Sequence, residues 1–259
     1  MEKIGIIGGT GVKIDILDNV RQIKLNTPYG NTSDLITLGT LEDKEIVFIP
    51  RHGYNHSINP SNVPYKANIY AMKELNVTRI LAPCAVGSLK EEIIPGSFVF
   101  IDQFIDRTTK RDQTFYNGNQ VAHIPMGNPF CSELRNFLAK SASSLKLNFR
   151  KSGTNLVIEG PRFSTIAESN LFRSWNIDTI NMTMVPEVVL AREMQICYSS
   201  IAMVTDYDSW KDKIVDVPEI LSVMKANSYN VQELIKDVIK KLPEYKECNC
   251  SNALEGALL

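Results

Sequence analysis

The amino-acid sequence predicts an α/β fold with a mixed, mostly parallel central sheet. Short apolar runs typical of buried strands alternate with segments of helical periodicity, as in folds built from parallel strands and crossover helices. Residues 21–50 instead alternate apolar and polar side chains around turn signals, which indicates antiparallel hairpins. The 259 residues contain no Pro/Gly/Ser-rich linker, so a single domain, residues 1–259, is expected.

In the first half of the chain, the expected strands are 4–7, 47–50, 79–82 and 98–101. The hairpins turn at Tyr29-Gly30-Asn31 and at Leu41-Glu42-Asp43-Lys44. A helix follows Pro64, because Ala67, Ala71 and Leu75 recur at fourfold spacing. We expect the strand 79–82 to end in a small-residue loop, 83–88.

In the second half, residues 102–119 lack a clear period and predict a long surface loop, a kind that is usually functional or an oligomer contact. The expected helices are 132–145, 167–175, one opening at Pro186, and a long one N-capped by Asp216. The long helix has one apolar face, formed by Ile220, Met224, Val231, Leu234, Ile235 and Val238. Strands are expected at 154–158 and 198–204. The tail after Pro243 is polar and is predicted to be mobile.

The first strand runs into the glycine-rich turn Gly8-Gly9-Thr10-Gly11. Successive backbone N–H groups in such a turn form an anion-binding concavity, and the Thr10 hydroxyl adds a donor. The lysine of a phosphate-binding P-loop is absent, and the Gly-x-Gly-x-x-Gly register of dinucleotide-binding proteins ends on Ile14. A tight strand-to-loop turn without a ligand is the alternative.

Two further strand ends carry groups suited to anions. Arg51 and His52 follow the strand 47–50, and an arginine side chain presents a planar fork of donors to phosphate or carboxylate. Cys84 and Ala85 follow the strand 79–82. The alternative is that Arg51 is simply solvated on a loop. His123 has no such neighbours in the sequence, and a histidine of this kind is more typical of a packed or solvated residue than of a catalyst.

The strand 198–204 stops at Thr205-Asp206-Tyr207-Asp208. In open α/β sheets, ligands bind at the carboxyl ends of the strands. If strand geometry persists through Tyr207, both carboxylates point to one side and can meet one planar ligand. The alternative is that Asp206 and Asp208 are turn residues that accept hydrogen bonds from their own backbone.

Composition excludes several classes of partner. Lysine and arginine number 28 against 29 acids, a formal charge of -1, which gives no electrostatic case for nucleic acid or an anionic membrane. Neither a signal peptide nor an apolar run of about 20 residues is present, which predicts a cytoplasmic protein. The five cysteines have neither a secreted disulfide framework nor zinc-site spacing, so no metal is expected, and a disulfide between Cys131 and Cys197 or within the tail is left open.

Seven motifs along nearly the whole chain resemble the trimeric purine nucleoside phosphorylase superfamily, and within it the members that act on 5′-methylthioadenosine. They are GIIGGTG (5–11), RHG (51–53), AVGSL (85–89), DQFIDRT (102–108), EGPRFS (159–164), NMTMVPE (181–187) and TDYD (205–208). The resemblance implies a three-layer phosphorylase/hydrolase-like fold and a homo-oligomer, a trimer or a dimer of trimers. It also implies phosphorolysis of 5′-methylthioadenosine to adenine and 5-methylthioribose 1-phosphate, with inorganic phosphate as co-substrate and no cofactor.

The resemblance assigns roles to individual residues. Phosphate would be held by Thr10, Arg51, His52, Cys84, Ala85 and Thr183. The nucleoside would lie against Phe163, Ser164, Asn181, Met182, Tyr207, Asp206 and Asp208, with Val217, Ile220 and His123 of a neighbouring subunit around the methylthio group. Close relatives often carry Ser or Thr where this chain has Cys84, a poorer hydrogen-bond donor. The Cys248-Asn249-Cys250 tail resembles that of archaeal members, which implies structural disulfides.

The implied chemistry agrees with the residue types. The leaving adenine gains negative charge while the sugar becomes cationic, so a proton at N7 and a positioned phosphate both lower the barrier. Asp206 is the candidate proton donor, and because a free aspartic acid has a pKa of about 3.9, this role requires burial or a nearby negative charge. Asp208 would accept the N6 hydrogens, which a 6-oxopurine lacks, so adenine is expected to be preferred over hypoxanthine.

Three alternatives remain at the level of sequence. The first is a broader purine nucleoside or methylthioinosine phosphorylase, which Asp208 disfavours. The second is an oxidoreductase that binds a dinucleotide at the N-terminal glycines, which the missing third glycine disfavours. The third is a nucleoside-binding protein without catalytic activity.

Overall fold

The computed structural model describes residues 3–9, 15–211 and 216–259, with the backbone alone at Glu219. The helices are α1 (Tyr65–Glu74), α2 (Ser132–Ser144), α3 (Ile166–Ser174), α4 (Met184–Glu193) and α5 (Val217–Lys241), with the short 3₁₀ helices η1 (Tyr54–His56), η2 (Asp208–Trp210) and η3 (Asn249–Asn252). The strands are β1 (Lys3–Gly8), β2 (Asp18–Ile23), β3 (Asn26–Thr27), β4 (Gly30–Asn31), β5 (Ile36–Leu41), β6 (Lys44–Pro50), β7 (Val77–Ser88), β8 (Phe98–Phe100), β9 (Gln103–Asp106), β10 (Phe149–Arg150), β11 (Thr154–Val157), β12 (Thr179–Asn181) and β13 (Cys197–Asp206).

The main sheet has the strand order β10-β8-β13-β7-β1-β6-β5-β2. Its centre is parallel, because β7 pairs in parallel with β1 and β13, and β1 pairs in parallel with β6. The β2, β5 and β6 strands are antiparallel neighbours, and Glu42 and Asp43 between β5 and β6 both have positive φ, as a two-residue hairpin turn requires. The mixed, mostly parallel sheet predicted from the sequence is confirmed.

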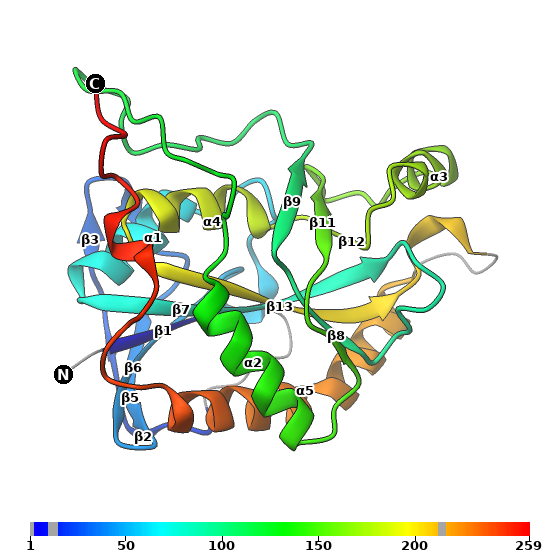
Figure 1. Ribbon diagram of the computed structural model, residues 1–259, viewed down its shortest axis with the longest axis horizontal. Coiled ribbons are helices and arrows are strands. Elements are labelled where there is room, and N and C mark those ends of the chain that lie inside the picture. Colours follow the sequence, from blue (N-terminus) through cyan, green and yellow to red (C-terminus); the bar gives the residue numbers. More distant parts are fainter. Residues whose placement is uncertain (1–2, 10–14, 212–215) are drawn as a thin grey trace.

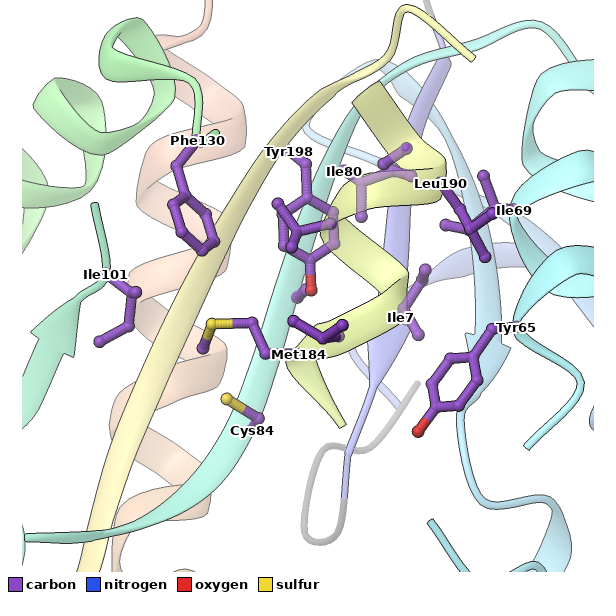
Figure 2. Packing of buried hydrophobic residues seen from close by; sticks show 14 of the residues in the cluster. Ile7, Tyr65, Ile69, Ile80, Cys84, Ile101, Phe130, Met184, Leu190 and Tyr198 are labelled. Atoms are coloured by element: carbon purple, nitrogen blue, oxygen red, sulfur yellow. The ribbon is translucent and has the colours of Figure 1, made fainter. Parts of the chain in front are cut away.

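Helices cover both faces of this sheet, as Figure 1 shows: α1 and α4 lie on one face, α2 and α5 on the other. On the first face, an apolar cluster that includes Tyr198, Met184 and Cys84 fills the space between the sheet and α4 (Figure 2). On the second face, the apolar stripe predicted for the last long helix is buried at Val231, Leu234 and Val238. These two cores make the three layers.

The β7 strand joins the main sheet to a smaller parallel group, β12, β11 and β9. On one side β7 pairs with β13 along most of its length. On the other side the ladder with β1 ends at Leu81, and the ladder with β12 includes only Gly87 and Ser88. Among the described residues, the stretch of β7 between these two ladders therefore has an open backbone edge.

This long strand corrects the expectation that residues 83–88 form a loop. The small residues and Pro83 favoured a loop in the sequence, but pairing with β13 keeps the segment extended. Pro83 is compatible with a central strand here because its carbonyl, which accepts from Arg51 Nη1 at 3.1 Å, faces the open edge. Its missing N–H therefore removes no ladder bond.

Two other segments make defined hydrogen bonds to the rest of the molecule, and the mobility expected after Pro243 stays a prediction. The expected surface loop 102–119 contains β9, and its Arg111 donates to the Glu159 carboxylate and to the carbonyl of Val185. The segment after Pro243 is attached to the rest of the molecule, because Arg79 donates to the carbonyls of Pro243 and Tyr245. Near its end, the Leu259 N–H donates to the carbonyl of Val121.

All five cysteines are free thiols, so neither of the disulfides left open by the sequence is formed. Four of them nevertheless gather in one cluster: Cys131, Cys197, Cys248 and Cys250. Within the described part of the chain, no helix combines the length and apolarity that crossing a membrane requires.

Candidate active site

A cavity of about 410 Å³ opens beside β7, where the β1 and β12 ladders leave its backbone edge free. The residues after β6, the carboxyl ends of β12 and β13, and the start of α5 complete its wall. This is the position at which open α/β sheets bind ligands, the point where neighbouring strands diverge. The sheet topology therefore determines where the cavity lies.

Twelve of the residues singled out from the sequence line this cavity: Arg51, His52, Cys84, Ala85, Phe163, Asn181, Met182, Thr183, Asp206, Asp208, Val217 and Ile220. Thr10 lies outside the described residues. Ser164 is buried behind the wall, and its carbonyl accepts from Ser209 Oγ at 2.7 Å. Tyr207 does not line the cavity: its ring packs edge-on against Trp210 and its hydroxyl donates to the carbonyl of Glu91, so its expected contact with the nucleoside stays a prediction.

His123 does not line the cavity of its own chain. Its side chain is exposed, and its backbone N–H donates to the carbonyl of Ala257 at 2.8 Å. Its expected role concerned a neighbouring subunit and stays a prediction.

Arg51 is almost fully buried and forms a two-pronged ion pair with Glu187. Nε and Nη2 each lie 2.7 Å from one carboxylate oxygen. Nη1 donates to the carbonyl of Pro83 and Nη2 to that of Ile7. Burial opposes the charge of Arg51, but the Glu187 carboxylate outweighs it and the pKa of Arg51 is raised. A guanidinium has five N–H bonds, so the described partners leave one, on Nη1, for a ligand.

His52 is buried, and its ring stacks on that of His56 with centroids 4.1 Å apart. Its Nδ1 lies 2.8 Å from the carbonyl of Ile58, which only accepts, so Nδ1 carries the hydrogen and Nε2 is an acceptor in the neutral ring. Burial, followed by the positive charge of Arg51, lowers the pKa of His52 to about 4. The imidazole is therefore neutral near pH 7.

Cys84 lies within β7 and not at its end. Its Sγ accepts from Asn181 Nδ2 at 3.5 Å and lies 3.4 Å from Ser200 Oγ. The other end of the Asn181 amide accepts from Asn155 Nδ2 at 2.9 Å, so the orientation of Asn181 is fixed. Backbone groups alternate sides along a strand, so the N–H of Ala85 shares the open edge with the Pro83 carbonyl.

Asp206 is the last residue of β13, and each of its carboxylate oxygens has a hydrogen-bond partner. Oδ1 accepts from the backbone N–H of Asp208 at 2.8 Å, and Oδ2 lies 2.7 Å from Thr205 Oγ. The turn interpretation is thus confirmed for Asp206, and both aspartates also line the cavity. A Cβ on Gly87 would lie 3.0 Å from Oδ1, so glycine leaves the space that the carboxylate occupies.

Asp208 starts η2 with a φ of 50°, so strand geometry does not persist through Tyr207 as expected. Its side chain is buried, and burial raises its pKa, an effect that the nearby Ser169 hydroxyl partly offsets. Among the described residues, Oδ2 makes no well-formed hydrogen bond. A buried oxygen without a well-formed hydrogen bond is favourable for a ligand that brings a better-aligned donor.

The remaining wall is apolar. Met182 and Phe163 lie on one side, and the first turns of α5 contribute Val217, Leu221 and Met224. Gly160 has a φ of 66°, and a Cβ there would lie 2.5 Å from the sulfur of Met182. Glycine at this position therefore sets where the Met182 side chain lies.

Sequence reasoning missed the partners that support these groups. Glu187 is 136 positions from Arg51, and Tyr198, whose hydroxyl donates to Glu187 Oε1 at 2.7 Å, has no spacing that links it to either. His56 was noticed only as a neighbour of His52 in the sequence. Its place three residues after the positive-φ Gly53 is the one local sign of a turn that brings its ring onto that of His52.

The family model of the phosphorylase superfamily matches residues 3–240. The chain is 53% identical over 255 residues to the S-methyl-5′-thioadenosine phosphorylase of Pyrococcus furiosus, with 98% of each covered. It is 48% identical over 261 residues to the protein of that name from Nitrosopumilus maritimus, with 99% of each covered. A structure of methylthioadenosine phosphorylase from Schistosoma mansoni in complex with adenine superposes with a TM-score of 0.94 at 36% identity, covering 99% of this chain and 97% of that one. The chain therefore belongs to the phosphorylase superfamily, as the seven motifs indicated.

Proposed function

We propose that the chain catalyses the phosphorolysis of S-methyl-5′-thioadenosine. A phosphate oxygen attacks C1′ of the ribose, the bond from C1′ to N9 breaks, and its electron pair passes to the purine, which takes up a proton at N7. The products are adenine and 5-methylthioribose 1-phosphate. The observation that carries the proposal is the cavity beside β7, with two carboxylates at one end and an open backbone edge at the other.

The phosphate is assigned to the open edge of β7. The N–H of Ala85, the remaining N–H of Arg51 and the hydroxyl of Thr183, the residue before α4, supply donors there. Neutral His52 contributes differently, because its Nε2 accepts a hydrogen and so suits a protonated phosphate oxygen. Arg51 acts through one N–H and its charge, because Glu187 occupies its fork.

The purine is assigned to the two aspartates. Thr205 Oγ lies 2.7 Å from Asp206 Oδ2 and 3.2 Å from the carbonyl oxygen of Val86. Its single hydrogen can point to either acceptor, so Thr205 can donate to the Asp206 carboxylate or accept from the carboxylic acid. Asp206 is thereby supported in both protonation states, which a residue that delivers a proton to N7 requires.

Asp208 is assigned to the exocyclic amino group of adenine. Its Oδ2 is buried without a well-formed hydrogen bond among the described residues, and an N6 hydrogen would satisfy it. The apolar start of α5 suits a methylthio group, which offers no strong hydrogen bond. Asn181 and Met182 would border the ribose between these ends.

Inorganic phosphate is a co-substrate in this scheme, and no cofactor takes part. The proposal includes a cytoplasmic homo-oligomer in which His123 of one subunit borders the cavity of the next. Light scattering coupled to size exclusion measures the oligomer, and His123→Ala should raise KM for S-methyl-5′-thioadenosine without altering KM for phosphate.

The central experiment measures adenine release from S-methyl-5′-thioadenosine with and without phosphate. We expect release only with phosphate and in equal amount to 5-methylthioribose 1-phosphate. Inosine and methylthioinosine are tested alongside, because faster turnover of either would favour the broader purine nucleoside phosphorylase. Phosphate-independent release or no release would overturn the proposal.

A further inference from the structure

Four of the five cysteines converge although they lie in three separate segments of the chain. Cys131 is the N-cap residue of α2, Cys197 is the first residue of β13, and Cys248 and Cys250 belong to the segment around η3. Their sulfur atoms all lie within 4.8 Å of one another. None of the four cysteines lines the cavity beside β7, and the cavity next to the cluster has no residue in common with it. The cluster is therefore separate from the site of the proposed reaction.

We propose that these four cysteines form a structural zinc site. A tetrahedral site with Zn–S bonds of about 2.3 Å holds its sulfur atoms roughly 3.8 Å apart. Cys197 and Cys248 have their sulfur atoms 3.2 Å apart, and all four cysteines are mutual neighbours. Two disulfides would instead require pairs at about 2.0 Å, and all five cysteines are free.

The positions of the four residues are set by contacts other than the sulfurs. The backbone N–H of Cys131 donates to the carbonyl of Tyr198 at 2.9 Å, which fixes α2 against β13. Glu133 Oε2 accepts from the backbone N–H of Cys248 at 3.0 Å, and Arg79 donates to the carbonyls of Pro243 and Tyr245. The tail therefore presents its two cysteines to a preformed site.

The surroundings suit a thiolate-bound ion. The N–H of Leu134, in the first turn of α2, donates to Cys131 Sγ at 3.5 Å, and this end of a helix favours negative charge. A cavity of about 530 Å³, lined among others by Cys131, Cys248 and Cys250, gives the ion a path from solvent. Its remaining wall carries Arg135 and Arg192 together with Asp102 and Glu247.

The donor set selects the kind of ion. Four sulfur ligands in a tetrahedral arrangement suit zinc, whereas calcium and magnesium require oxygen ligands. With four protein ligands the ion has no open position, so it stabilises the fold and takes no part in catalysis. It would join the start of α2, the start of β13 and the C-terminal segment.

The test begins with the whole protein, purified under reducing conditions without chelator and dialysed against zinc sulfate and then buffer. We expect one zinc per chain by mass spectrometry of the metal content. Cys250→Ser should retain little zinc, and Cys84→Ser, which changes the one cysteine outside the cluster, should retain the full amount. Circular dichroism reports whether each variant is folded.

Two further readouts do not depend on any variant. Cobalt substituted for zinc should give the visible absorption of a tetrahedral thiolate site, and a mercurial that blocks the thiols should release the bound zinc. A chelator should lower the Tm of the wild type but not that of Cys250→Ser. Reduced wild type that retains no more zinc than Cys250→Ser and shows no cobalt absorption would overturn the proposal.

Discussion

Arg51 and Glu187 lie face to face within the core, with both N–O distances of their two-pronged pair at 2.7 Å. Each side chain is at most 2% exposed. At such a depth neither charge is solvated by water, so each residue depends on the other. The pair holds Arg51 beside the carbonyl of Pro83, at the end of the cavity proposed for phosphate, and at the same time makes the core sensitive to substitution.

Glu187→Gln should therefore destabilise the protein by about 3–5 kcal/mol, because it leaves the buried guanidinium without its counter-charge. Urea denaturation measures the change. The matched control is Glu91→Gln, which removes the partner of Lys211 at the surface and should cost less than about 1 kcal/mol. Similar losses for the two variants would contradict the importance of the buried pair.

His52 makes stability dependent on pH. Its pKa is lowered from 6.5 to about 4 in the folded chain, so in this window the unfolded chain binds the extra proton. The contribution of His52 to the free energy of unfolding is complete above pH 6.5 and is lost as the pH falls toward 4. A difference of about 2.5 units corresponds to about 3 kcal/mol at most.

His52→Asn retains a donor for the Ile58 carbonyl but does not titrate, so its free energy of unfolding should fall less steeply between pH 6.5 and 4. Chemical denaturation across this range is the measurement, with the exposed His123→Asn as control for the loss of one imidazole. Parallel pH profiles for wild type and His52→Asn would refute the assignment.

Substitution of the two aspartates should have different effects on catalysis. Asp206→Asn keeps the hydrogen-bonding shape but cannot deliver a proton, so kcat should fall by about a hundredfold to ten-thousandfold. Asp208→Asn offers an amide N–H, which a 6-oxopurine accepts, so preference should move toward inosine and methylthioinosine. Steady-state kinetics with the three nucleosides checks both, and unchanged activity of both variants would exclude the mechanism.

Gly160→Ala should raise KM for the nucleoside. The new Cβ would lie 2.5 Å from Met182 Sδ and would displace that side chain at the cavity wall. Gly30→Ala is the control, because it also places alanine at positive φ but meets nothing within 4 Å. Both variants should lose about 1–2 kcal/mol of stability, and only Gly160→Ala should alter KM. An equal KM for the two variants would show that Met182 does not border the nucleoside.

Local patterns predicted much of the fold. The apolar stripe of α5 and the hairpin turn at Glu42 and Asp43 were found because both depend on neighbours in the sequence. The extension of β7 through Ser88 was missed because β13 and β12, far along the chain, hold that segment extended. Composition in this segment favoured a loop, and tertiary pairing overrode it.

The same limit applies to the site. Asp206 and Asp208 were predicted together because they are two positions apart, and a turn there was one of the two interpretations, although the outward Tyr207 was not foreseen. The pairing of Arg51 with Glu187 had no signal, since their separation follows no period. A metal site at the four clustered cysteines was not predicted for the same reason, because they come from three segments and their spacing in the sequence is not that of a zinc site.

Because β7 belongs both to the main sheet and to the smaller group of β12, β11 and β9, it limits which insertions and deletions the sequence can tolerate. A slip of one residue against β13 would turn the side chains of Cys84 and Val86 to the opposite face of the sheet. It would also turn the backbone groups of Pro83 and Ala85 from the open edge toward β13. The distance between the two ends of the cavity is thus fixed by the length of one continuous strand. Insertions or deletions between Leu81 and Gly87 should be far less tolerated than in the turns that follow other strands.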